Sequence, residues 1–221
     1  MQVLGDSSMV QQVARHVEVF HIDDTTGHDW WHIWRVWNLA RHIAQLEGAD
    51  MLQVELAALL HDMDDHKMAK SDGENLPNAR NVLHDCNVDN RLIESVVQII
   101  KQVSFKGAGG DTTPTSAEAC VVQDADRLDA IGAIGIARAF AYGGSKHREL
   151  YNPNEEPSMH GTFAEYKSSK GNTLNHFYEK LLLLKERLNT QSARELADGR
   201  HRYMEGFVEQ FLGEWNLEDK P

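Results

Sequence analysis

The chain has 221 residues, 41% hydrophobic and 25% charged, which is typical of a globular protein and excludes a disordered or fibrous chain. It contains 22 Lys and Arg residues and 34 Asp and Glu residues, so the formal charge is −12 and the surface repels polyanions. We therefore expect neither nucleic-acid polymers nor membranes among its partners, and an anionic substrate would need local cations or a metal ion.

The first half of the sequence shows apolar residues at three- and four-residue spacing, the pattern of amphipathic helices. Gly48 is suited to end one of these helices, and Asp50 to cap the next. Pro77 is suited to the first position of a later helix, and Asp89 to the cap of another. In chain order the predicted helices cover residues 9–20, 29–47, 51–61, a segment starting at 77, and a segment following 89.

The second half predicts further helices and one long connection. A helical pattern at residues 116–142 contains Gly132 and Gly135, which would let a neighbouring helix approach closely. Residues 143–173 lack periodicity, and we expect this long loop to form a lid or wall over a site. Residues 174–215 predict two helices broken near residues 189–191. Because no convincing alternating strand pattern occurs, the predicted fold is all-α, in one domain spanning residues 1–221.

Four residues carry a pattern of metal-ligand chemistry: His32, the adjacent pair His61 and Asp62, and Asp126. Two imidazoles and two carboxylates suit a divalent ion such as Mn, Mg, Co, Ni or Fe, and no cysteine lies near enough in sequence to favour a structural zinc site. Four protein ligands on a six-coordinate ion leave positions for water and for a phosphate oxygen, as catalysis requires.

The order and spacing of these residues resemble those of the HD superfamily of metal-dependent phosphohydrolases. His32 precedes His61 by 29 residues, and Asp62 precedes Asp126 by 64. The surrounding segments resemble a small bacterial single-domain subgroup, the YpgQ/YedJ-like proteins, and the likeness covers nearly the whole chain. The segments are GHDWWHIWRV at 27–36, LHDMDDHK at 60–67, DADRLDAIGAIG at 124–135 and RHRYM at 200–204.

This resemblance implies a compact HD-domain helical bundle in which His32, His61, Asp62 and Asp126 are the metal ligands. It also implies hydrolysis of nucleoside triphosphates to a monophosphate and pyrophosphate, with manganese as the first choice of ion. Nucleoside monophosphatase and cyclic nucleotide phosphodiesterase activities are the alternatives within the family. From another class, the chain would be a regulatory module that binds a nucleotide without turnover, or a diiron oxygenase with Asp62 bridging two irons.

Asp65 is the candidate catalytic residue beside the metal. It follows Asp62 by three residues and would share its face if the helix continues there, and relatives carry an acidic residue at this place, so Asp65 could orient or deprotonate the attacking water. The alternative is that Asp64 and Asp65 are solvated charges at a helix end.

Substrate phosphates require cationic side chains near the metal, because the protein as a whole is anionic. Lys67 is the first candidate, followed by His66, Arg35 and Lys106. His28 lies one helical turn before His32 and could orient that ligand or contact the substrate.

The expected partner is thus a small nucleotide, and a homodimer is compatible with the apolar carboxy-terminal helices. The two cysteines lack Cys-x-x-Cys spacing, and the sequence shows neither a signal-peptide pattern nor 18 consecutive apolar residues. We therefore expect a cytoplasmic protein.

Overall fold

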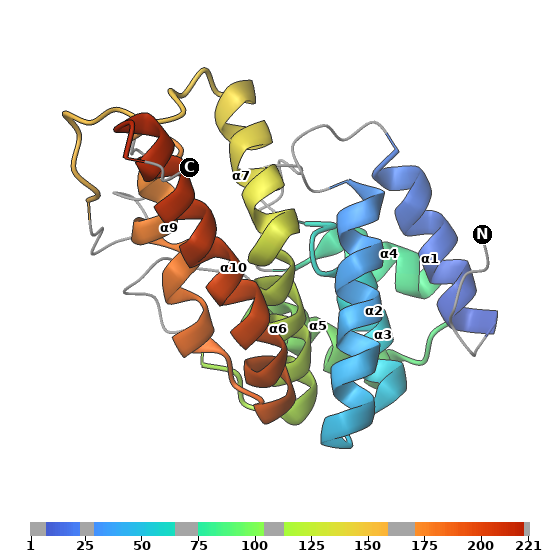
Figure 1. Cartoon of the computed structure of the whole chain (residues 1–221). Coiled ribbons are helices and arrows are strands. Elements are labelled where there is room, and N and C mark those ends of the chain that lie inside the picture. Colours follow the sequence, from blue (N-terminus) through green and yellow to red (C-terminus); the bar gives the residue numbers. More distant parts are fainter. Residues whose placement is uncertain (1–7, 23–28, 65–74, 104–112, 159–170, 219–221) are drawn as a thin grey trace. The chain divides into compact units, whose positions relative to one another are not determined.

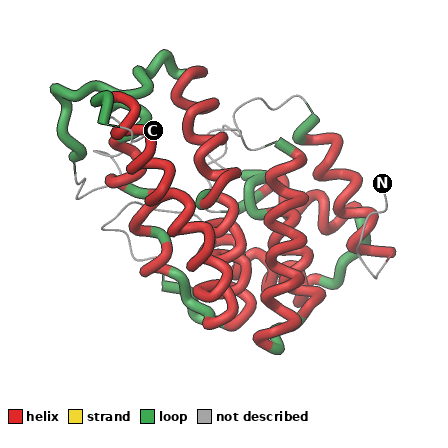
Figure 2. Tube along the Cα trace, in the orientation of Figure 1, coloured by secondary structure: helices red, strands yellow, loops and turns green. Residues whose placement is uncertain are grey.

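The computed structural model describes residues 8–22, 29–64, 75–103, 113–158 and 171–218, and these residues form helices joined by loops (Figure 1). No strand occurs within these ranges, which confirms the all-α prediction (Figure 2). In the same ranges, no helix combines the length and the apolar character that crossing a bilayer would need. The helices are α1 (Ser8–Phe20), α2 (Trp30–Glu47), α3 (Met51–Leu60), α4 (Pro77–Asp85), α5 (Asn90–Val103), α6 (Ala117–Asp129), α7 (Gly132–Ser145), α9 (Asn175–Glu179), α10 (Gln191–Trp215) and two 3₁₀ turns, η1 (Leu181–Leu183) and η2 (Lys185–Arg187).

The ends of α2 and α3 lie where their capping residues predict. The Asp29 side chain accepts a hydrogen bond from the His32 backbone N–H, and that of Asp50 accepts one from Gln53. Gly48 closes α2 in a left-handed conformation with φ of 72°, which costs glycine little because it has no β-carbon. These caps fix the start of α2, which carries His32, and the start of α3, which His61 and Asp62 follow.

The chain divides into two compact units. The first contains α1 to α5 and α6 as far as Asp126, and the second contains the chain from Arg127 onward. Within the first unit, α3 packs against α1, α2 and α5. Its residues from Val54 to Leu60 are all buried, so α3 is the central helix of an aliphatic core.

A buried hydrogen bond and an ion pair join α2 to α3 inside this core. The Trp37 indole N–H donates to the Glu55 carboxylate over 3.2 Å, and the Arg41 Nε lies 2.9 Å from the same oxygen. Because burying a carboxylate is costly unless it is paired, these contacts favour one alignment of the two helices.

In the second unit α7 packs against α10. A β-carbon added at Gly132 would lie 3.0 Å from the Arg200 β-carbon, so this glycine allows the close approach that the sequence predicted. Arg200 donates to the Leu128 carbonyl over 2.5 Å, and Arg138 pairs with Asp129 at 2.7 Å.

Two helix predictions in the second half need correction. The helix expected at residues 116–142 is two helices, because the chain turns after Asp129 and Gly132 begins the second helix with a left-handed φ of 77°. The first helix expected after residue 174 is α9 followed by η1 and η2, because Lys180 leaves the helical region at φ −143°. Leu181, Leu184 and Leu188 repeat at spacings of three and four, and a spacing of three also fits a 3₁₀ helix.

The predicted long connection begins slightly later than expected, because α7 continues to Ser145. Residues 159–170 lie outside the described part of the chain. The lid at about residues 143–173 and the single domain at residues 1–221 therefore stay predictions.

Candidate metal centre

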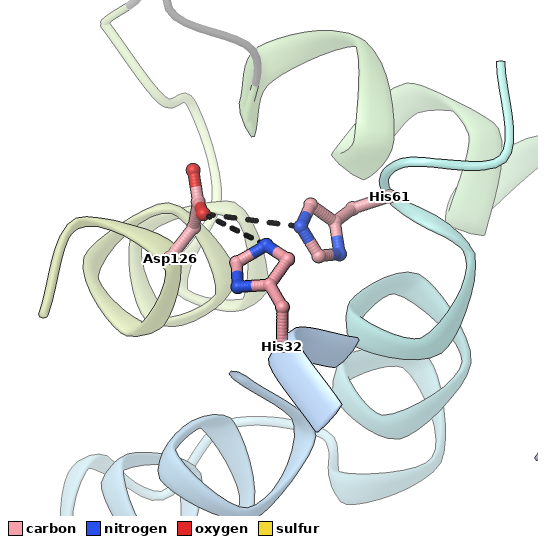
Figure 3. A group of neighbouring side chains, drawn as sticks. All are labelled: His32, His61 and Asp126. Atoms are coloured by element: carbon pink, nitrogen blue, oxygen red, sulfur yellow. Dashed lines mark ion pairs between the residues drawn. The ribbon is translucent and has the colours of Figure 1, made fainter. Parts of the chain in front are cut away.

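Three of the four candidate ligands, His32, His61 and Asp126, point toward one another from separate segments of the first unit (Figure 3). His32 lies in the first turn of α2, held there by the Asp29 cap. His61 and Asp62 directly follow α3, and Asp126 belongs to α6. The fold thus brings together residues that lie up to 94 positions apart in the sequence.

The donor atoms lie close enough to share one ion. One donor atom from each of His32, His61 and Asp126 lies within 4.8 Å of the others. The Asp126 Oδ1 is 3.6 Å from the His32 Nε2 and 3.9 Å from the His61 Nε2 (Figure 3). With metal–ligand bonds of about 2.0–2.2 Å, adjacent donors on one ion lie about 3 Å apart, so the observed spacing needs only small side-chain shifts.

Asp62 lies beside this group, with a different carboxylate oxygen near each histidine. Its Oδ2 lies 3.3 Å from the His32 Nε2, and its Oδ1 lies 3.5 Å from the His61 Nε2. Two imidazoles and two carboxylates therefore face one another, as the sequence pattern predicts for a mixed nitrogen and oxygen site.

The hydrogen bonding of His61 favours a metal ligand. Its Nδ1 lies 2.8 Å from the Ala58 carbonyl oxygen, which can only accept, so Nδ1 carries a proton and Nε2 is the ring nitrogen that faces the carboxylates. This Nε2 is buried without a hydrogen-bond partner, an arrangement that costs free energy unless another species satisfies it. A divalent cation at this position would do so, and the donor set fits one.

Burial divides the site into a sheltered side and an open side. The side chains of His32 and His61 are 0% and 2% exposed, whereas that of Asp126 is 34% exposed. The histidines therefore exclude water from one side, and the Asp126 carboxylate is accessible from solvent.

The candidate catalytic and phosphate-binding residues remain predictions. Asp65, His66, Lys67, His28 and Lys106 lie outside the described residues. Arg35 is described: it lies on α2, three residues after His32, and is half-buried.

The prediction that Asp64 is a solvated charge at a helix end is wrong. The side chain is buried, with its two oxygens accepting from the Asn78 and Ala79 backbone N–H groups over 3.0 and 2.9 Å. Sequence reasoning missed this contact. The available signal was the lack of a capping side chain at Leu76, directly before Pro77.

Comparisons with known proteins identify the family of the chain. A family model described as the HD domain matches residues 30–131, which include all four candidate ligands. YpgQ of Bacillus subtilis (strain 168), described as uncharacterized, is 39% identical over 208 residues, 94% of each chain.

Solved structures are also similar over nearly the full length. A protein from Lactobacillus plantarum has a TM-score of 0.83 at 37% identity, covering 97% of this chain and 100% of that chain. YpgQ in complex with ADP has a TM-score of 0.74 at 35% identity, covering 95% and 100%. An HD-superfamily hydrolase from Bacillus thuringiensis has a TM-score of 0.72 at 40% identity, covering 94% and 96%.

Proposed function

Because this chain belongs to the HD domain family, we propose that it is a metal-dependent phosphohydrolase acting on small nucleotides. The proposed reaction is hydrolysis of a nucleoside triphosphate to a monophosphate and pyrophosphate. The observation that carries the proposal is the cluster of His32, His61, Asp62 and Asp126, with a buried His61 Nε2 that a cation would satisfy.

Two relatives support a nucleotide as the substrate and hydrolysis as the reaction. YpgQ has been crystallised in complex with ADP, and the Bacillus thuringiensis relative is described as an HD-superfamily hydrolase. ADP, like a nucleoside triphosphate, consists of a base, a sugar and a chain of phosphate groups. Since similarity extends over at least 94% of this chain for both, a small nucleotide is the substrate class that best fits.

The chain's own residues would hold a divalent ion at this site. His32 and His61 would supply neutral imidazole nitrogens, and Asp62 and Asp126 would supply carboxylate oxygens. When bound, such an ion lowers the pKa of a water ligand and polarises a phosphoryl oxygen. The buried histidines keep bulk water from one side, which strengthens the electrostatic interactions there.

Further residues have proposed roles in positioning and proton transfer. Asp65 would accept the proton of the attacking water, and Lys67 would neutralise substrate phosphates, supported by His66, Arg35, His28 and Lys106. Manganese is the first choice of ion. Mg, Co, Ni and Fe are alternatives, because a mixed imidazole and carboxylate set accepts all of them.

The test is an assay of metal-stripped protein against nucleoside mono-, di- and triphosphates, with Mn, Mg, Co and Ni added back. We expect metal-dependent release of pyrophosphate from a triphosphate. Release of inorganic phosphate from a monophosphate, or a linear product from a cyclic nucleotide, would identify the two alternatives within the family.

Matched variants separate the site from the fold. His61→Ala should abolish turnover and metal binding, whereas His42→Ala should change neither, because His42 is exposed on α2. If His61→Ala retained full activity, the proposed site would be wrong. If no nucleotide turned over while a nucleotide complex survived for days with metal, the regulatory module would replace the hydrolase.

A further inference from the structure

A reciprocal set of hydrogen bonds joins the turn after α3 to the start of α4 in the first unit. The Asp64 carboxylate accepts from the Asn78 and Ala79 backbone N–H groups, over 3.0 and 2.9 Å. In return, the Asn78 side-chain amide donates to the Met63 carbonyl over 3.1 Å. We call these three hydrogen bonds the Asp64 clamp.

The first turn of α4 depends on this clamp for its cap. Pro77 has no N–H, so Asn78 and Ala79 supply the first backbone donors that the helix itself cannot satisfy. Leu76 occupies the cap position with an apolar side chain and a φ of 46°, and it makes no side-chain cap hydrogen bond. Asp64 therefore caps α4 from a different segment of the chain, and its charge also favours the positive end of the helix dipole.

The same carboxylate lies two residues after a candidate metal ligand. Helix α3 ends at Leu60, so His61 and Asp62 lie beyond its regular hydrogen bonding. The turn itself is held by the Met63 N–H, which donates to the Leu60 carbonyl over 3.1 Å. On its far side, the turn is anchored by the clamp at Met63 and Asp64, both buried.

We propose that Asp64 is a positioning residue for the metal site. By holding the turn against α4, the Asp64 clamp fixes His61 and Asp62 in the arrangement that faces His32 and Asp126. This inference rests on the metal site of the proposed function. It assigns to Asp64 no contact with metal or substrate.

The test measures Mn²⁺ affinity by direct titration of metal-stripped protein, alongside thermal stability. Asp64→Ala should weaken Mn²⁺ binding by about 10-fold or more, the scale of losses when groups that orient ligands are removed. Asp64→Asn keeps one accepting oxygen and should lose less. Asn78→Ala removes only the bond to Met63 and should have the smallest effect of the three.

Asp50→Ala is the matched control, because Asp50 caps the opposite end of α3 through Gln53. It removes an equivalent side-chain cap at a distance from the ligands, so we expect lower stability with Mn²⁺ affinity within about twofold of wild type. In activity assays, Asp64→Ala should raise the Mn²⁺ concentration needed for half-maximal rate, and saturating Mn²⁺ should restore much of kcat.

The outcomes separate this inference from the proposed function. Wild-type affinity in Asp64→Ala, or an equal loss in Asp50→Ala, overturns the positioning role while leaving the metal site in place. If Asp64→Ala does not fold, a wild-type affinity for Mn²⁺ in both Asp64→Asn and Asn78→Ala overturns the positioning role of Asp64. A wild-type protein that binds neither Mn²⁺ nor the other ions overturns both.

Discussion

The two units of the chain hold different clusters of side chains. The first has an aliphatic core with imidazoles and carboxylates placed inside it, including His32, His61, Asp62 and Asp64. The second contains a cluster of aromatic rings, with neighbouring centroids 5.7–6.2 Å apart among Phe140, Phe177, Phe207, Phe211 and Trp215.

This difference indicates where chemistry and stability are concentrated. Buried carboxylates and imidazoles cost free energy unless they are paired or bind an ion, so the convergence of His32, His61 and Asp126 in the first unit favours a functional site. Packed aromatic rings gain free energy from buried area and edge contacts. Substitutions in the first unit should therefore reduce metal binding and turnover most, and those in the ring cluster should reduce stability most.

Asp62→Ala should have the largest effect on function. It removes the carboxylate that lies 3.3 and 3.5 Å from the two histidines. We expect turnover to fall about a thousandfold or more, equivalent to about 4 kcal/mol of activation free energy. The measurement is kcat/KM with Mn²⁺, together with metal content.

Stability provides the control for this variant. Mn²⁺ that binds only the folded state should raise the melting temperature of the wild type, and this increase should disappear in Asp62→Ala. Without metal, the variant should be as stable as the wild type, because a costly buried charge has been removed. A variant that kept both turnover and the metal-dependent increase would refute the assignment of Asp62.

Phe177→Ala should have the opposite profile. Phe177 is fully buried, and its ring contacts Phe140 and Phe207. Removing it should lower the free energy of unfolding by about 3–5 kcal/mol, through lost burial and the cavity left behind. Urea unfolding measures this loss, and Mn²⁺ titration of the folded variant should give wild-type affinity.

Phe177→Leu should lower the free energy of unfolding less than Phe177→Ala, since it keeps much of the buried volume. An affinity for Mn²⁺ that fell in parallel with stability in both variants would contradict the division between the two units.

Much of the first unit was predictable because local signals mark its helix ends. Gly48, Asp50 and Pro77 all lie at the helix boundaries that these residue types favour. Capping chemistry acts within one turn, so a single sequence displays it directly. The four candidate ligands were recognisable from their order and spacing, and the structure places them together.

The errors arose where distant contacts decide the structure. The cap of α4 comes from Asp64, and no local pattern links that residue to Asn78. The segment from Leu181 to Leu188 repeats apolar residues in a way that suits both α and 3₁₀ geometry, so the sequence alone did not separate them. Spacing predicts which residues are buried better than it predicts how the backbone turns between them.

His176 should make the stability of the second unit depend on pH. Burial, together with the positive charges of Lys180 and Arg148, lowers the pKa of His176 from 6.5 to about 3. The unfolded chain therefore binds a proton more readily, so the stabilising contribution is complete above pH 6.5 and is lost as pH falls towards 3. We expect a loss of about 1–2 kcal/mol between pH 6.5 and 5, at up to about 1.4 kcal/mol per pH unit.

Urea unfolding of metal-free protein at pH 7, 6 and 5 measures this slope, and His176→Gln should flatten it. Metal-free conditions matter because proton competition at the imidazole ligands would add a separate dependence. An identical slope in His176→Gln and wild type would assign the pH dependence to other groups.

Thr190→Ala should have the smallest effect. Thr190 caps α10 by accepting a hydrogen bond from the Ala193 N–H, but the distance of 3.3 Å is long for such a bond. We therefore expect a loss near the lower end of the range for helix caps, about 0.5–1 kcal/mol. Urea unfolding should show this loss with no change in Mn²⁺ affinity, and Thr190→Ser should retain wild-type stability because it keeps the accepting hydroxyl. Asp50 caps α3 through a shorter hydrogen bond of 3.1 Å. Asp50→Ala should therefore lower the free energy of unfolding more than Thr190→Ala does. The reverse order would show that the length of the capping hydrogen bond does not determine how much each cap stabilises its unit.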